Sequence, residues 1–258
     1  MQKNISQCQV ISQETIAPGI CSMWLQARII AENAVPGQFV SVYCPDPSRL
    51  LPRPVSLCEA DAASGRIRLV YRITGENTGT HILAQLRQGD YLRVLGPIGN
   101  GYPMDLAQGK KVLLVGGGIG IPPMLETAKR LEDPVPVLGY RDLPFLNKDF
   151  EEYAKVFTAT EDGSAGTRGT VLDVIREEKL HGDMIFACGP LPMLKAVAAY
   201  AAGNHIPCWV SLEERMACSV GACLGCVCRT KSEDPHFRTR TRRVCKDGPV
   251  FPAEEVEL

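Results

Sequence analysis

Short segments that alternate apolar and polar residues dominate the first hundred positions of the chain. Between Arg66 and Leu69, for example, polar and apolar side chains alternate as they do in a half-buried strand. Turn signals separate these segments, so residues 1–103 predict a small antiparallel β-barrel. The expected strands include CSMWLQA, QFVSVY, RIRLVYR and YLRVLG, and the turn signals are Pro36-Gly37, Ser64-Gly65 and Gly89-Asp90.

The pattern changes in residues 104–212, where apolar runs alternate with segments of helical character. The strand-like runs are KVLLV, VPVLGY, KVFTAT, DMIFACG and IPCWVSL, and the helix-like stretches span 122–131, 171–178 and 192–202. Such alternation is typical of a parallel sheet wrapped by helices, so we expect an α/β domain here.

The last part of the chain, residues 213–258, has little periodic pattern and is rich in Cys, Gly and Arg. A segment of this kind needs something other than a hydrophobic core to hold it, and a metal centre would do so. The sequence therefore predicts a multidomain protein with a small C-terminal metal-binding subdomain.

Composition narrows the class of protein. The 258 residues are 45% hydrophobic, enough for more than one core, and the net charge of -1 gives no overall field that would attract nucleic acid or anionic lipid. The first ten residues lack the apolar stretch of a signal peptide, and the run 112–125 is too short and too rich in Gly and Pro for a membrane span. We expect a cytoplasmic protein with no membrane partner.

The cysteines carry the most specific signal. Of eleven, four crowd between Cys218 and Cys228, and Cys245 follows soon after. An odd count and a cytoplasmic setting argue against a disulfide framework. Cys218, Cys223, Cys226 and Cys245 follow the C-x4-C-x2-C…C spacing of plant-type [2Fe-2S] centres, so we predict them as the ligands.

The small residues between these cysteines fit that prediction. Gly221, Ala222 and Gly225 allow the backbone to approach closely, so that its N–H groups can donate to the sulfurs. The alternatives are a structural zinc site, for which two C-x2-C pairs would be expected, or a loop of unligated thiols. Cys228 is taken as a neighbour, because a ligand there would break the x2 spacing.

A glycine turn marks a second candidate site. The run 112–115 leads directly into Gly116 to Pro123 and then into a helix-like stretch, and backbone N–H groups at such a junction can bind a pyrophosphate. Gly117, Gly118 and Gly120 are the candidates, although the pattern from Gly118 is G-x-G-x-x-P instead of G-x-G-x-x-G. The alternative is a tight turn without a ligand.

Two positions further along extend this nucleotide site. Asp142 could bind the ribose diol of NAD, whereas Arg141 could bind the 2′-phosphate of NADP, and the sequence leaves the choice open. Cys188 lies in Cys-Gly-Pro at the end of a later strand, where a parallel sheet would present it to a nicotinamide. A buried thiol before a turn is the alternative for Cys188.

The two predicted cofactors together require a third. A nicotinamide exchanges two electrons as a hydride and a [2Fe-2S] cluster takes one, so a chain that holds both needs a carrier such as flavin. In the barrel, Arg53 and Arg72 are candidates for the phosphates and Ser56 for the ring. Gly79 and Thr80 open a helical stretch as its N-cap and would meet the pyrophosphate, with Asn77 and Thr78 as the alternative pair. The full flavin set is Arg53, Pro54, Val55, Ser56, Val70, Tyr71, Arg72, Gly79 and Thr80.

With these residues in place, the chain resembles the ferredoxin-reductase superfamily and, within it, the electron-transfer subunits of type B dihydroorotate dehydrogenase. The resemblance covers essentially the whole chain, and its C-terminal motifs are the specific ones. It rests on Arg53-Pro-Val-Ser56, Tyr71-Arg72, Gly99-Asn-Gly-Tyr102, Cys188-Gly-Pro190, Glu214-Arg-Met-Ala-Cys218 and Val244-Cys-Lys-Asp-Gly-Pro-Val-Phe251.

The resemblance implies FAD in residues 1–103, NAD in residues 104–212 and the cluster in residues 213–258. It further implies a catalytic partner subunit with FMN, a heterotetramer of two subunits of each kind, and a role in pyrimidine biosynthesis. Two departures stand out: Val55 replaces an aromatic residue of the wider superfamily, and the Gly75 to Thr80 loop is longer than the usual turn.

Two other functions remain open at this stage. One is the small subunit of another flavin and iron–sulfur complex, linked to ferredoxin or sulfide, which would reuse the same three parts. The other is a zinc-stabilised nucleotide-binding module without redox activity. No Ser–His–Asp or paired-carboxylate arrangement is apparent, so we assign the chain no catalytic residue of its own.

Overall fold

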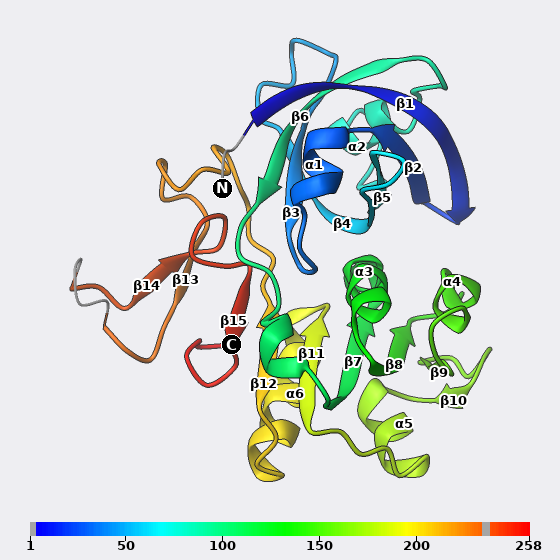
Figure 1. Ribbon diagram of the computed structural model, residues 1–258, viewed down its shortest axis with the longest axis vertical. Helices are drawn as coiled ribbons and strands as arrows, with labels where there is room; N and C mark the ends of the chain where they lie inside the picture. Colours follow the sequence, from blue (N-terminus) through cyan, green and yellow to red (C-terminus); the bar gives the residue numbers. More distant parts are fainter. Residues whose placement is uncertain (1–3, 234–237) are drawn as a thin grey trace.

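The computed structural model describes residues 4–233 and 238–258. A β-barrel lies above an α/β domain, and a small two-stranded hairpin lies to one side (Figure 1). The barrel is closed in the order β1-β2-β5-β4-β3-β6 with antiparallel neighbours, which confirms the predicted barrel. Its strands are β1 (Asn4–Ala17), β2 (Ile20–Gln26), β3 (Phe39–Tyr43), β4 (Arg53–Asp61), β5 (Arg66–Arg72) and β6 (Tyr91–Ile98).

Strand periodicity decides which side chains fill the barrel. On β3, Val40 and Val42 pack in the barrel core, whereas Phe39, Ser41 and Tyr43 point outward because neighbouring residues alternate between faces. Two short helices accompany the barrel, α1 (Arg28–Asn33) and α2 (Gly79–Leu83), and Leu83 belongs to the same core.

The second domain is the predicted parallel sheet covered by helices. The sheet order is β10-β9-β8-β7-β11-β12-β15, in which every pair is parallel except the last. Its strands are β7 (Lys111–Gly117), β8 (Asp133–Tyr140), β9 (Phe157–Thr160), β10 (Thr167–Arg168), β11 (Met184–Cys188), β12 (Cys208–Ser211) and β15 (Val250–Pro252). The helices are α3 (Pro122–Arg130), α4 (Asn147–Glu151), α5 (Val171–Glu177) and α6 (Leu191–Gly203), with 3-10 turns η1 (Met104–Ala107) and η2 (Gly118–Gly120).

The C-terminal segment is joined to both domains. It forms the hairpin of β13 (Val227–Arg229) and β14 (Thr241–Arg243) and then returns to the sheet as β15. Its buried residues Cys226 and Cys245 share one core cluster with Phe39 of the barrel and with the α/β sheet. The predicted boundary at residue 213 separates two segments of the sequence, but one hydrophobic core contains residues from both sides of that boundary.

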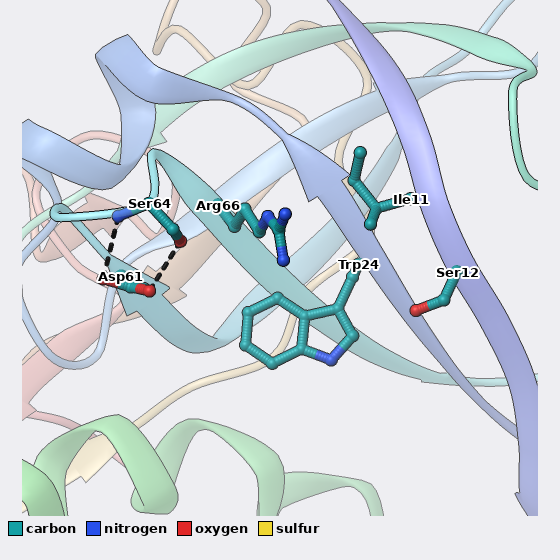
Figure 2. A pocket seen from close by; sticks show the side chains of 6 residues that line it. All are labelled: Ile11, Ser12, Trp24, Asp61, Ser64 and Arg66. Atoms are coloured by element: carbon teal, nitrogen blue, oxygen red, sulfur yellow. Dashed lines mark hydrogen bonds between the residues drawn. The ribbon is translucent and has the colours of Figure 1, made fainter.

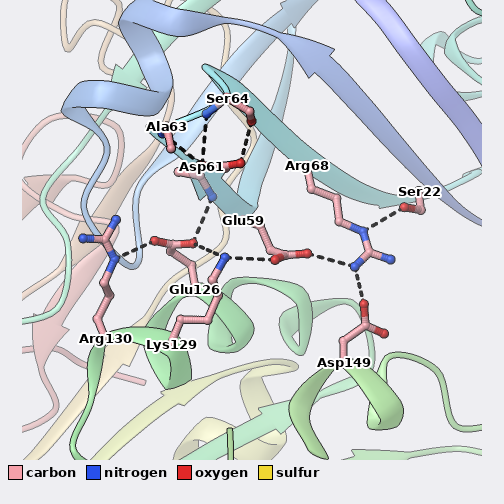
Figure 3. Close-up of polar contacts among 11 residues, drawn as sticks. Ser22, Glu59, Asp61, Ala63, Ser64, Arg68, Glu126, Lys129, Arg130 and Asp149 are labelled. Atoms are coloured by element: carbon pink, nitrogen blue, oxygen red, sulfur yellow. Dashed lines mark hydrogen bonds and ion pairs between the residues drawn. The ribbon is translucent and has the colours of Figure 1, made fainter. Parts of the chain in front are cut away.

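A network of charged side chains joins the barrel to the α/β domain (Figure 3). Arg68 on β5 contacts Glu59 on β4 at 2.9 Å and also Asp149 on α4. Glu59 in turn contacts Lys129 on α3 at 3.0 Å. Burial alone would lower the pKa of Lys129, but its contacts with Glu59 raise it, so the amine stays charged.

The burial of Arg68 differs from what strand alternation suggested. The sequence placed it on the polar face of a half-buried strand, yet only 7% of the residue is exposed, because the α/β domain covers that face of β5. Arg68 also donates to the hydroxyl of Ser22 at 3.0 Å. Among the helices in the described ranges, none is long and apolar enough to span a bilayer.

Candidate functional site

The four cysteines predicted as cluster ligands lie together in two pairs. The Cys218 thiol interacts with that of Cys223, and the Cys245 thiol interacts with that of Cys226 and with the charge of Cys218. Cys223 is exposed, whereas Cys226 and Cys245 are buried. Among residues 4–233 and 238–258, no three His, Cys, Asp or Glu side chains are arranged as ligands of one single metal ion.

Backbone N–H groups surround these sulfurs. The N–H groups of Ala222 and Cys223 donate to Cys218 Sγ at 3.3 and 3.4 Å, and that of Gly225 donates to Cys223 Sγ at 3.4 Å. Burial alone would raise the pKa of Cys218, but these donors and that of Val220 lower it to about 6. The loop thus favours a thiolate, the form that ligates iron.

The second pair sits deeper and its donors are also backbone groups. The Cys245 N–H donates to Cys226 Sγ at 3.4 Å. Burial and the neighbouring Cys226 sulfur raise the pKa of Cys245 to about 12. A bound iron would deprotonate Cys245, because a coordinating thiol loses its proton.

Cys228 has different surroundings. It lies on β13 opposite Arg242, and burial raises its pKa to about 11 despite a hydrogen bond with the Arg242 backbone. Cys228 packs in the same core cluster as Cys226 and Cys245, so its role as a neighbour instead of a ligand stays a prediction.

Polar contacts anchor the cluster loop to its surroundings. Arg243 holds Asp247 at 2.9 Å and donates to the carbonyl of Gly221 at 3.3 Å. Ser41 of β3 donates to the hydroxyl of Ser219 at 2.6 Å. Neither serine was identified from the sequence, because a lone Ser, in a strand like Ser41 or in a loop like Ser219, gives no signal of what covers it.

The flavin candidates on β4 divide between the two faces of the strand. Val55 occupies the sequence position of the superfamily's aromatic residue, but its side chain packs in the barrel core and so does not take over the stacking role. Pro54 is exposed and Ser56 half-buried on the outer face. The guanidinium of Arg53 lies against α2, since a Cβ built on Gly79 would be 2.3 Å from Arg53 Nε.

The candidates on β5 divide in the same way. Tyr71 points into the barrel, where its hydroxyl donates to Gln13 at 3.0 Å, and Val70 faces the α/β domain. Arg72 is exposed at the end of the strand, and its guanidinium reaches the glycine turn, 3.7 Å from a Cβ built on Gly118. The barrel and the nucleotide turn therefore meet at Arg72.

The helix after the long loop begins one residue earlier than expected. α2 starts at Gly79 and its N-cap is Thr78, whose hydroxyl accepts from His81 N–H at 3.3 Å. The predicted N-cap at Gly79-Thr80 was wrong in this respect, because Thr80 instead uses its hydroxyl within the loop, where it accepts from Thr74 N–H at 3.0 Å.

The glycine turn combines two roles. A Cβ on Gly120 would lie 2.4 Å from the carbonyl oxygen of Cys188, and one on Gly117 would lie 2.5 Å from the sulfur of Met193, so these glycines permit close packing. Gly118 has a φ of +53°, which favours glycine, and faces Arg72. It is the member of the turn best placed to approach a ligand from the barrel side.

Asp142 follows the carboxyl end of β8, and Cys188 is the carboxyl end of β11. These two strands lie on either side of β7 in the sheet. Asp142 and Arg141 are both exposed on the loop after β8. Cys188 ends β11, and burial raises its pKa to about 12, with Ser211 of β12 as its hydrogen-bond partner. Ligands bind at these strand ends in open α/β sheets.

A further pocket lies away from all these residues. Figure 2 shows it on the barrel wall, between β1, β2 and β5. Its lining residues are Ile11, Ser12, Trp24, Asp61, Ser64 and Arg66, and none of the predicted site residues is among them. The predicted site residues lie instead where the barrel, the α/β domain and the cluster loop meet, and we take this junction as the candidate site.

Known protein families match the barrel and the cluster segment of this chain. Residues 213–257 match the family model "Iron-sulfur cluster binding domain of dihydroorotate dehydrogenase B", and residues 7–102 match "Oxidoreductase FAD-binding domain". The chain is 44% identical to a protein of Geobacillus sp. (strain WCH70) named dihydroorotate dehydrogenase B (NAD(+)), electron transfer subunit, over 98% of each chain. A protein of the same name from Bacillus caldolyticus is also 44% identical, over 96% of this chain and 97% of that relative.

Solved structures show the same architecture. A chain of the NADH-dependent reduced ferredoxin-NADP oxidoreductase superposes with a TM-score of 0.83 and is 27% identical, covering 97% of this chain and 89% of its own. A ferredoxin NADP+ reductase from Neisseria gonorrhoeae has a TM-score of 0.63 at 17% identity, which shows a shared fold over 77% of this chain.

Proposed function

Because the chain belongs to the family of dihydroorotate dehydrogenase B electron transfer subunits, we propose that its three parts form one route for electrons. The route leads from a catalytic partner subunit through a [2Fe-2S] cluster and FAD to NAD. The observation that carries this proposal is the pairing of the four cysteines, each pair supplied with backbone N–H donors, beside β3, which pairs with the flavin-motif strand β4.

Cys218 and Cys223 would hold one iron, and Cys226 and Cys245 the other. Two pairs of thiolates suit a two-iron cluster, and the N–H groups aimed at the sulfurs offset the negative charge that four thiolates bring. When bound, the cluster accepts and releases one electron at a time.

FAD would lie across the outer face of β4 and the end of β5. Arg53 and Arg72 supply positive charge for its phosphates, and Pro54 and Ser56 present the outward surface for the ring. Val55, Val70, Tyr71 and Thr80 would contribute through the backbone, since their side chains are buried, and Gly79 has only its backbone to offer. When bound, FAD can exchange a hydride with NAD and single electrons with the cluster.

NAD would bind at the carboxyl ends of the parallel strands. Gly118 lets the chain approach a pyrophosphate beside Arg72, and Gly117 and Gly120 shape the turn. Asp142 would accept from the ribose hydroxyls. Cys188 stays a neutral thiol next to the nicotinamide, because burial raises its pKa to about 12.

The partner would be an FMN-containing catalytic subunit that oxidises dihydroorotate in pyrimidine biosynthesis, in a heterotetramer of two subunits of each kind. Val220 and Leu224 of the cluster loop, 40% and 61% exposed, support a docking surface beside the cluster. We also propose a cytoplasmic location, because the ligands have to stay reduced thiolates.

Co-purification with the neighbouring subunit, followed by a dihydroorotate-to-NAD assay, tests partner and substrate together. Electron transfer from dihydroorotate to NAD only in the presence of both subunits is the expected result. The similarity to the ferredoxin-linked oxidoreductase favours one second candidate, a ferredoxin-linked small subunit. Reduction of ferredoxin with no response to dihydroorotate would establish that function instead.

Single substitutions test the ligand set. Serine at Cys218, Cys223, Cys226 or Cys245 should abolish the paramagnetic signal of the reduced cluster, because an alcohol replaces a thiolate ligand. Cys228→Ser is the matched control and should keep the signal. A signal that survives Cys245→Ser would overturn the assignment.

A further inference from the structure

One buried hydrogen bond connects the cluster loop to the barrel. Ser41 Oγ on β3 donates to Ser219 Oγ at 2.6 Å, across 178 positions of sequence. Ser41 is 0% exposed and Ser219 is 1% exposed, so both hydroxyls depend on this contact for the hydrogen bonding that water would otherwise supply. Ser219 directly follows the proposed ligand Cys218.

The other end of this contact adjoins the flavin motif. Ser41 pairs directly with Pro54 of β4, and Phe39 pairs with Ser56. Directly opposed residues of an antiparallel pair share a face, with Cβ atoms about 4.5–5.5 Å apart. Ser41 therefore lies one strand from the outward residues of the flavin motif and touches the residue beside a cluster ligand.

The loop conformation is adapted to this contact. Ser219 has a φ of +57°, a left-handed conformation that is uncommon for residues other than glycine. The positive φ at Ser219 and Gly221 turns the loop so that the Ser219 hydroxyl faces the barrel while Cys218 and Cys223 face each other. Nearby, Phe39 packs in one core cluster with Cys226 and Cys245, so the barrel surface continues beneath this second cysteine pair.

We propose that Ser41 and Ser219 are positioning residues for electron transfer between the flavin and the cluster. Their hydrogen bond fixes the cluster loop against β3, the strand that pairs with the flavin-motif strand β4, and so sets the distance that the electron crosses. This inference rests on the proposed function. Each passage moves one electron and makes or breaks no covalent bond. Two passages carry the two electrons of one hydride exchanged with NAD, and the accompanying proton is exchanged with water at the flavin.

The test compares the full chain, loaded with its cofactors, with Ser41→Ala, Ser219→Ala and the double variant. NADH is mixed anaerobically with each protein, flavin reduction is followed by absorbance, and cluster reduction is followed by rapid freezing and paramagnetic resonance. Each single variant should reduce its cluster more slowly, by up to about 5- to 150-fold, because a buried hydroxyl without its partner costs about 1–3 kcal/mol and shifts the loop by at most that factor away from its docked position. The rate of flavin reduction by NADH should not change.

The double variant separates positioning from a merely structural role. Removing both hydroxyls leaves no unsatisfied group, so the free energy of unfolding should return toward that of the parent. Cluster reduction should stay slow, and the backbone amides of the loop should exchange hydrogen faster than in the parent. Thr230→Val is the matched control, because this buried hydroxyl bonds within its own segment, to the carbonyl of Ser232 at 2.9 Å.

Several results would overturn the inference. Parent-like cluster reduction in the double variant would do so, as would a slowing fully explained by a shift in the cluster's reduction potential, measured by redox titration. Slowing in Thr230→Val equal to that in Ser41→Ala would also do so. A parent protein without a cluster signal would overturn the proposed function and this inference with it, whereas unchanged variants of an active parent would overturn this inference alone.

Discussion

Replacement of Arg68 by methionine should destabilise the protein because it breaks the charged network between the two domains. The Arg68 side chain is 9% exposed and contacts Glu59, 13% exposed, and Asp149, 33% exposed. Removing one member of a buried ion pair costs about 3–5 kcal/mol. Glu59 keeps Lys129 at 3.0 Å and Asp149 can regain water, so we expect the lower end of that range, about 3 kcal/mol.

Equilibrium urea unfolding of the cofactor-loaded chain, followed by circular dichroism, measures this loss as a lower midpoint. Arg66→Met is the matched control, since Arg66 lies on the same strand and is exposed, and it should change the free energy of unfolding by no more than about 0.5 kcal/mol. A loss below about 1 kcal/mol for Arg68→Met, or equal losses for the two variants, would refute the argument from burial.

Three further results are expected. Gly120→Ala should raise the KM for NADH, since the new Cβ would lie 2.4 Å from the Cys188 carbonyl oxygen and displace the glycine turn, whereas Gly203→Ala, in open space, should not. Tyr71→Phe should cost about 1 kcal/mol in urea unfolding yet leave the FAD content unchanged, because its hydroxyl bonds inside the barrel. The pKa of Asp247 is lowered below 3.8, since hydrogen bonds outweigh its burial. Asp247→Asn should therefore destabilise the chain by a constant amount above about pH 5, and hydrogen exchange should show that difference shrinking as pH falls through the lowered pKa.

The barrel, the parallel sheet and the cluster spacing could be predicted from the sequence because each depends on local patterns. Apolar periodicity identified β5, β7 and β11, and ligand spacing identified the four cysteines. These signals need no knowledge of which elements pack together.

Contacts between distant elements could not be predicted in this way. Alternation placed Arg68 on a polar face, but the sequence did not reveal that α3 and α4 cover it. Val55 and Tyr71 were recognised as parts of a motif, yet strand phase turned their side chains into the barrel. The partnership of Ser41 with Ser219 depends on a turn 178 positions away, for which a single sequence carries no signal.

The return of the chain to the sheet has a consequence for how such a protein can be assembled. Ser211 of β12 pairs directly with Val250 of β15, so the whole iron–sulfur segment leaves and re-enters the α/β domain at one place. In topological terms it is an enlarged hairpin connection between two adjacent antiparallel strands. The length of this connection therefore does not affect the order of the parallel strands, while its buried cysteines still join the core of the sheet.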